Sequence, residues 1–164
     1  MIIILKNKDT LKFDEFYFNC CVGKNGKTIN KIEGDKKTPI GVFSIGNLYY
    51  RKDRLNKPIT NLKCIPITKK MGWCNDVTNK KKYNKLIKIK KKIKHEKMFR
   101  HDYKYDLLIH IKYNHNKTVL NKGSAIFLHL TKKYTPTDGC IALAKKDFLI
   151  LLKIINKNTK IKII

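Results

Sequence analysis

The sequence predicts a mainly β fold of sandwich-like form with one or two helices. Short apolar runs rich in Val, Ile, Phe and Tyr recur along the chain, and these residue types suit a pleated sheet. Turn residues separate the runs at short intervals, which favours a sandwich or barrel over a parallel α/β sheet. The chain has 164 residues, of which 42% are apolar. We therefore expect one domain, residues 1–164, with a sizeable core.

The expected strands are short and follow one another along the whole chain. Residues 106–114 alternate, with Leu107, Ile109 and Ile111 on one face, as in a strand with two distinct faces. Residues 124–130 (SAIFLHL) are apolar on both faces, as expected for a central buried strand. The expected strands are residues 1–5, 15–22, 40–50, 106–114, 124–130 and 159–164, with a turn at 23–26.

Two segments permit a helix. In residues 145–158, apolar side chains recur at the i, i+3, i+4, i+7 spacing of an amphipathic helix. These side chains are Phe148, Leu151, Leu152 and Ile155. Residues 79–102 are ambiguous, because their apolar positions permit a helix while the alternation in residues 86–90 (LIKIK) permits a strand.

The chain is strongly basic, with 38 Lys and Arg against 12 Asp and Glu and a formal net charge of +26. Such a charge suits an anionic partner, for example nucleic acid, acidic lipid or an anionic wall polymer. Lys, Asn and Ile are enriched together throughout the chain, which is typical of an AT-rich genome. Because the lysines are spread out, we favour coding bias and expect no nucleic-acid partner. The lysine run at 80–97 fits a solvated face, with a polyanion groove as the alternative.

Targeting and membrane signals are absent from the visible sequence. No apolar run approaches the roughly 20 residues of a membrane-spanning helix. The opening MIIILKNKDTLKF lacks the basic start and longer apolar stretch of a secretory signal. We therefore expect no membrane span, and either no export or export by another route.

The cysteines do not form a recognisable metal or disulfide pattern. They are Cys20, Cys21, Cys64, Cys74 and Cys140. Because their number is odd and no CxxC pair occurs, a cysteine zinc site and a dense disulfide framework are disfavoured. We expect no metal and at least one free thiol. Cys20, Cys21 and Cys64 lie in apolar runs, which predicts structural positions for them.

The stretch IFLHLTKKYTPTDGCIAL, residues 126–143, is the one that suggests chemistry. His129 and Cys140 are eleven positions apart. If residues 124–130 and 140–143 form neighbouring strands, His129 can approach Cys140 and take its proton, which creates a nucleophilic thiolate. The structural alternative stays open, since a histidine at a strand end and a buried cysteine commonly serve packing alone.

The turn before Cys140 carries residues that suit acyl chemistry. Gly139 has no Cβ, so a substrate carbonyl can come close to the backbone there. Amides around Asp138, Gly139 and Cys140 are then able to face a developing oxyanion. The side chains of Thr137 and Asp138 are able to order the turn.

Several ordered motifs resemble one known family. HLTKKYTPTDGCIAL (129–143) is similar to the active-site segment of the L,D-transpeptidase (YkuD-type) catalytic domain, and EGDKKTPIGVFSI (33–45) resembles that family's Gly-Asp-x-x-Thr-Pro-x-Gly-x-Phe motif. A compact bacterial subgroup carries further pieces similar to GWCND (72–76), YN (83–84), HE (95–96), YDLLI (105–109) and GSAIFLHL (123–130). The resemblance covers nearly the whole chain.

The resemblance implies an L,D-transpeptidase-like β-sandwich that acts on peptidoglycan stem peptides. Cys140 then corresponds to the nucleophile and His129 to the general base. Gly139 and the Cys140 amide correspond to the oxyanion site, and Thr137 takes a Ser/Thr position that orients the histidine or the turn. The implied reaction forms a thioacyl-enzyme from a stem tetrapeptide, releases D-alanine, and makes 3→3 cross-links or exchanges D-amino acids.

The same resemblance implies an enzyme without a cofactor or metal. It also implies a location in the periplasm or cell wall, which conflicts with the missing signal. We expect a monomer that contacts stem peptides and, through its charge, an anionic wall polymer. Two positions depart from many family members: Asp138 stands where they have His, and Ala142 stands where they have Arg. The alternatives are an L,D-carboxypeptidase, another cysteine hydrolase, and a non-catalytic module that binds cell wall or polyanions.

Overall fold

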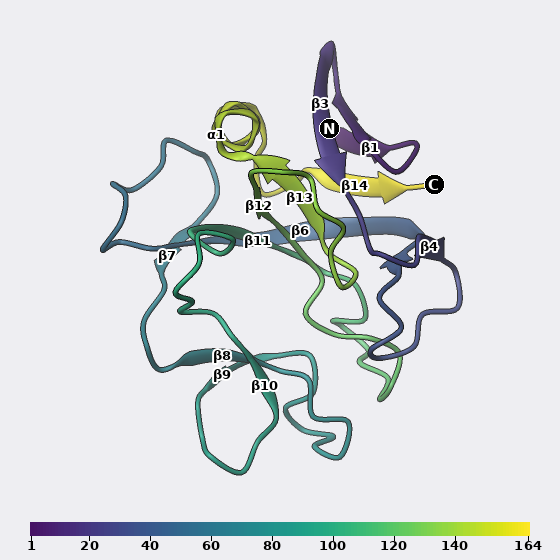
Figure 1. The fold of residues 1–164 in the computed structure, drawn as a ribbon, viewed down its shortest axis with the longest axis vertical. Helices are drawn as coiled ribbons and strands as arrows, with labels where there is room; N and C mark the ends of the chain where they lie inside the picture. Colours follow the sequence, from purple (N-terminus) through teal and green to yellow (C-terminus); the bar gives the residue numbers. More distant parts are fainter.

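The computed structural model describes residues 1–164 and confirms the mainly β class, with a single helix (Figure 1). The strands are β1 (Ile2–Leu5), β2 (Thr10–Phe13), β3 (Phe16–Cys21), β4 (Lys27–Thr28), β5 (Thr38–Pro39), β6 (Gly41–Tyr50), β7 (Cys64–Pro66), β8 (Met71–Cys74), β9 (Leu86–Lys88), β10 (His95–Lys97), β11 (Leu107–Ile111), β12 (Phe127–Thr131), β13 (Ile141–Ala144) and β14 (Lys160–Ile163), and the helix is α1 (Lys145–Ile154). The helix is not long and apolar enough to span a membrane.

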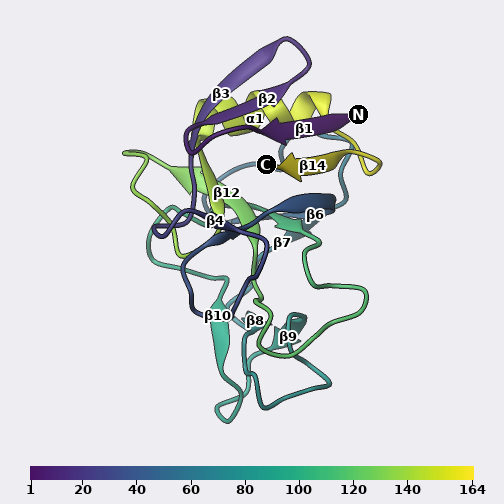
Figure 2. The same cartoon turned by 90° about the vertical axis from the view of Figure 1, so that its right-hand side faces the viewer.

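The main sheet closes on itself into a barrel-like core. Its strand order is β11-β12-β13-β3-β2-β1-β14-β6-β7, and β11 also pairs with β6, so eight strands form a ring with β7 added at β6. The pairs β1–β14, β12–β13 and β6–β7 are parallel. Strands β10, β8 and β9 form a separate three-stranded sheet. Figure 2 shows this small sheet at the opposite end of the molecule from β1–β3 and α1.

The interior of the ring holds the main hydrophobic core. Alternation places Ile161 and Ile163 of β14 inside. The four apolar positions of the predicted helix are all buried in the same core. The helix, however, ends at Ile154 and not at residue 158. Ile155 is already extended, and the Asn156 amide donates to Thr159 Oγ1 instead of continuing the helical ladder.

Strands β11 and β12 separate two hydrophobic clusters. Leu107 and Ile109 face the main core, whereas Leu108 joins a second cluster with Trp73, Tyr105 and other side chains on the outer side of the ring. Every residue of β11 and β12 is buried, so the prediction of a central buried strand is confirmed. The second cluster lies between the ring and the small sheet, and it contains Cys140.

Residues 79–102 contain no helix, so the helical alternative for this segment is wrong. Strands β9 and β10 pair antiparallel with the two edges of β8, which matches the strand-like alternation of residues 86–90. Asn84 breaks any helical run because its φ is +57°, a left-handed conformation that does not fit an α-helix. The small sheet that results forms one wall beside the second cluster.

Burial of the helix on the ring predicts a position-specific effect on stability. Leu151→Ala removes a fully buried side chain from the core, and we expect the free energy of unfolding to fall by about 2–5 kcal/mol. Ile150, its neighbour on the same helix, is 41% exposed, so Ile150→Ala should change stability by about 0.5 kcal/mol or less. Urea denaturation measures both, and equal losses would show that α1 does not pack as described.

Candidate active site

The parallel pairing of β12 and β13 determines which side chains share a face. His129 lies opposite Ala142 in this register, and residues two apart in a strand point the same way. Cys140 directly precedes β13, so its side chain faces the same outer side of the ring as His129. A cleft of about 440 Å³ lies on this side, and both His129 and Cys140 line it.

The loop between the two strands differs from a simple hairpin. Because β12 and β13 run parallel, residues 132–140 return along the length of the sheet before β13 begins. Thr137 pairs on the way with the segment that follows β3: its amide donates to Val22 O (2.9 Å) and its carbonyl accepts from Lys24 N (2.8 Å). These bonds fix the loop as one wall of the cleft, where Thr137 and Asp138 also line it.

The Cys140 thiol is held by two backbone groups. The Phe127 amide donates a hydrogen bond to Cys140 Sγ (3.4 Å), and the thiol in turn donates to Ala125 O (3.3 Å). Cys140 is only 9% exposed, and burial raises the pKa of its thiol to about 12. At neutral pH the resting sulfur is therefore protonated, and it can act as a nucleophile only if a nearby base removes that proton.

His129 rests as a neutral imidazole. Its Nδ1 lies 3.0 Å from Leu130 O, and because a carbonyl only accepts, Nδ1 carries the proton and Nε2 keeps a free lone pair. Burial lowers the pKa of His129 to about 4. The Tyr105 ring packs against the imidazole at 5.3 Å between centroids and limits its orientation.

The turn before Cys140 is closed by Thr137. Its hydroxyl donates to Cys140 O (2.6 Å) and accepts from Gly139 N (3.1 Å). The Gly139 amide, which we expected at the oxyanion site, is therefore engaged within the turn. The amides of Asp138 and Cys140 donate to no protein acceptor, so they are the ones free to face a substrate oxygen.

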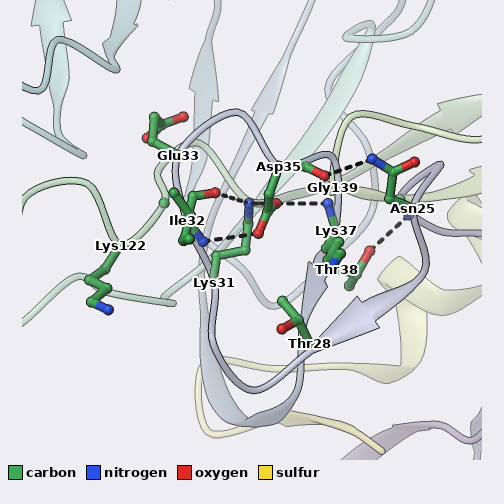
Figure 3. A network of polar contacts seen from close by, with 12 residues as sticks. Asn25, Thr28, Lys31, Ile32, Glu33, Asp35, Lys37, Thr38, Lys122 and Gly139 are labelled. Atoms are coloured by element: carbon green, nitrogen blue, oxygen red, sulfur yellow. Dashed lines mark hydrogen bonds and ion pairs between the residues drawn. The ribbon is translucent and has the colours of Figure 1, made fainter.

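Gly139 lies buried beneath the cleft against the loop that joins β4 to β5. Its φ is +129°, and a Cβ built there would lie 2.9 Å from Lys37 O. Asp35 fixes that loop by accepting hydrogen bonds from Ile32 N (2.9 Å) and Lys37 N (2.8 Å) and by an ion pair with Lys31 (Figure 3). Glycine is thus required at 139 by close packing against backbone as well as by φ.

The buried side-chain amide of Asn84 supports Ala125, whose carbonyl accepts the hydrogen bond from the Cys140 thiol. Ala125 has φ +53°, which is strained for a residue with a Cβ. Its amide donates to Asn84 Oδ1 (3.1 Å), and Asn84 Oδ1 also accepts from Trp73 Nε1 (2.9 Å). Asn84 Nδ2 donates to two loop carbonyls, those of Tyr113 (2.9 Å) and Asn114 (2.7 Å). Asn84 therefore holds Ala125, and through it the sulfur contact, in place.

The cleft also contains the carboxylate of Glu33, which residue chemistry alone did not identify. Glu33 Oε2 accepts from Ser124 Oγ at 2.7 Å and from the Tyr83 hydroxyl. Tyr83 and Asn84 belong to the motif YN, and Ser124 belongs to the motif GSAIFLHL. The family resemblance was therefore the only sequence signal that pointed to these three residues. Their roles depend on contacts between segments distant in sequence, which no spacing rule reveals.

The remaining cysteines are all free and lie outside the pair described above. Cys20 packs in the main core as predicted. Cys21 is buried as well, but it lies opposite Ala142 on β13, and its thiol donates to Thr135 O at 3.2 Å. No group of three His, Cys, Asp or Glu side chains is close enough together to hold a metal ion.

The packing of Gly139 predicts a stability effect larger than that of φ alone. We expect Gly139→Ala to lower the free energy of unfolding by about 2–5 kcal/mol, because strain and overpacking add. Gly26 also has positive φ, +81°, but no atom lies within 4 Å of a Cβ there, so Gly26→Ala should lose only about 1–2 kcal/mol. Thermal and urea unfolding compare them, and equal losses would contradict the close contact with Lys37.

Comparison with known proteins identifies one family for this chain. Residues 2–163 match the YkuD family, described as the L,D-transpeptidase catalytic domain. No curated protein matches the chain significantly. The family match covers nearly every residue of the fold, including both strands of the His129–Cys140 pair. The chain therefore belongs to the L,D-transpeptidase catalytic-domain family.

Proposed function

We propose that this protein is a peptidoglycan L,D-transpeptidase in which residues 1–164 act as one catalytic domain. The observation that carries the proposal is the shared cleft: Cys140 and His129 project from the same face of two paired strands and line one cavity. Membership of the family supports the same reaction class. Family enzymes act on peptidoglycan, so we propose the periplasm or cell wall as its location.

The first step of the proposed mechanism is acylation of Cys140. His129 Nε2 takes the thiol proton, and the sulfur attacks the carbonyl between the diaminopimelate L-centre and the terminal D-alanine of a stem tetrapeptide. The amides of Cys140 and Asp138 stabilise the oxyanion. The C–N bond then breaks, His129 gives its proton to the departing D-alanine amine, and a thioester remains on Cys140.

The second step transfers the acyl group. An amine of a second stem attacks the thioester carbonyl, His129 accepts a proton from that amine, and the C–S bond breaks as the C–N bond forms. The proton then returns to the sulfur. A stem amine gives a 3→3 cross-link, a free D-amino acid gives exchange, and water gives carboxypeptidase activity.

The charges around the cleft support a peptide substrate with several carboxylates. Five cationic side chains line the cleft, namely Lys31, Lys36, Lys94, Arg100 and Lys104. Three acidic side chains accompany them, namely Glu33, Glu96 and Asp138. Cations outnumber anions, which favours binding of an anionic stem peptide. The same surplus suits an anionic wall polymer beside the substrate.

A carbapenem provides a direct test of the nucleophile. We expect one covalent adduct per chain in intact mass spectra, mapped to Cys140, and none in Cys140→Ala. Cys64→Ala is the matched control, because Cys64 is more exposed than Cys140 yet lies outside the cleft, and it should keep the adduct. Cleavage of tetrapeptide stems by Cys140→Ala contradicts the proposal, and stem binding without acylation of the native protein favours a non-catalytic wall-binding module.

The low pKa of His129 predicts an unusual acid limit. Its pKa is about 4 in the folded protein against 6.5 for a free histidine, so the base stays neutral down to about pH 4. Acylation by the carbapenem should therefore continue below pH 6 and fall near pH 4, where protonation removes the lone pair. Half-loss of the acylation rate at pH 6.5 would contradict this placement of the imidazole.

The same shift predicts a loss of stability in acid. Between pH 6.5 and about 4, the unfolded chain takes up a proton at His129 that the folded chain does not. Native stability contributed by this group is therefore present above pH 6.5 and declines as pH falls through that window. Circular dichroism at each pH separates unfolding from the loss of the base.

A further inference from the structure

We propose that Glu33 is the ammonium-binding residue of the cleft and holds the amine of the acyl acceptor. This names the residue that binds the amine acceptor and explains how an amine competes with water for the thioester. The inference rests on the proposed transpeptidase function and deepens it. Four observations carry it: position, anchoring, the absence of a cationic partner, and the contrast with the other acidic residues of the cleft.

Two consecutive residues, Ser124 and Ala125, connect Glu33 to Cys140 by hydrogen bonds. Ser124 Oγ donates to the Glu33 carboxylate at 2.7 Å. The carbonyl of the next residue, Ala125, accepts a hydrogen bond from the Cys140 thiol at 3.3 Å. Glu33 and Cys140 line the same cleft. An acceptor bound to this carboxylate therefore lies beside the sulfur that carries the acyl group.

The carboxylate is held rigidly by groups that the protein has buried. Tyr83 is fully buried and Ser124 is 7% exposed, and both hydroxyls donate to the same oxygen, Oε2. The Glu33 amide is fixed as well, since it donates to Asn121 O at 2.9 Å. Oε1 has no protein donor among these hydrogen bonds and remains free to accept from a ligand.

Glu33 has no cationic partner, although the chain carries 38 Lys and Arg against 12 Asp and Glu. Lys31, the basic residue two positions before it, is already engaged with Asp35 and with Ile32 O. In Figure 3 these contacts lie within the loop, and no bond joins them to Glu33. An anchored carboxylate that stays unpaired in so basic a protein has the chemistry to bind an ammonium group.

The other two acidic side chains of the cleft do not share these properties. Glu96 is occupied by the Tyr105 hydroxyl (2.8 Å) and by Arg100. Asp138 is exposed, and no hydrogen bond anchors its carboxylate. Glu33 is thus the one carboxylate of the cleft that is both positioned and unpaired. The ammonium docked on it releases one proton to solvent, and the neutral amine then attacks the Cys140 thioester.

The test compares Glu33→Gln with Glu15→Gln. Glutamine keeps an oxygen for the two hydroxyls and removes only the charge, while Glu15 is exposed at the β2–β3 turn and is not among the residues that line the cleft. The measured quantity is the ratio of aminolysis to hydrolysis per acyl-enzyme formed, with a tetrapeptide donor and a D-amino acid acceptor. We expect Glu33→Gln to lower this ratio at least about tenfold, as loss of a charge-assisted bond implies, and Glu15→Gln to leave it unchanged.

The outcomes separate the two proposals. A purely structural defect reduces acyl-enzyme formation without changing the ratio, so an unchanged ratio in Glu33→Gln overturns the role of Glu33 alone. Failure of the native protein to acylate Cys140 overturns the proposed function and this inference with it. A second measurement does not depend on how Glu33→Gln folds: Cys140→Ala should bind an amine-bearing stem peptide at least about tenfold more tightly than its N-acetylated form. Equal affinities contradict the inference.

Discussion

The parallel, in-register pairing of β12 with β13 is the constraint on which the site depends. It aligns His129 with Ala142 and thereby puts His129 and Cys140 on one face of the sheet. A shift of one residue would turn one of the two side chains into the main core. Complete burial of β12 on both faces makes such a shift unfavourable, so the same apolar residues that form the core also set the positions of His129 and Cys140.

The environment of the pair keeps both groups uncharged at rest. Burial raises the pKa of Cys140 to about 12 and lowers the pKa of His129 to about 4. The sulfur consequently rests as a thiol bonded to Ala125 O, and His129 rests as a neutral imidazole. Under the proposed mechanism, charge develops only when substrate enters, where the free amides of Asp138 and Cys140 receive it. A protonated thiol is a poor nucleophile, so the resting sulfur stays unreactive until a base removes its proton.

Local periodicity predicted the elements that bury one clear stripe or face. The start of the helix at residue 145, the alternation of β11, and the hypothesis that residues 124–130 and 140–143 are neighbouring strands followed from patterns of apolar residues. The parallel direction of β12 and β13 did not, because both a hairpin and a returning loop fit residues 131–139. The ambiguity of 79–102 was resolved only by pairing with β8, a tertiary contact that no local pattern contains.

Site residues were predictable where their own chemistry is distinctive. A thiol after glycine and an imidazole within an apolar run stand out in any sequence, whereas Glu33 and Asn84 look ordinary until the fold brings them together with these residues. The Gly139 amide shows the opposite case: its proximity to Cys140 suggested an oxyanion role, but the Thr137 hydroxyl engages it. Hydrogen-bond competition of this kind is invisible in sequence.

Trapping the acyl-enzyme on a natural substrate tests the central claim most directly. The purified protein is mixed with a stem tetrapeptide, quenched in acid within the first turnover, and digested for peptide mapping. The account predicts a tripeptide joined by a thioester to Cys140, with one D-alanine released per adduct. Release of D-alanine with no adduct on Cys140, or an adduct on another residue, would contradict it.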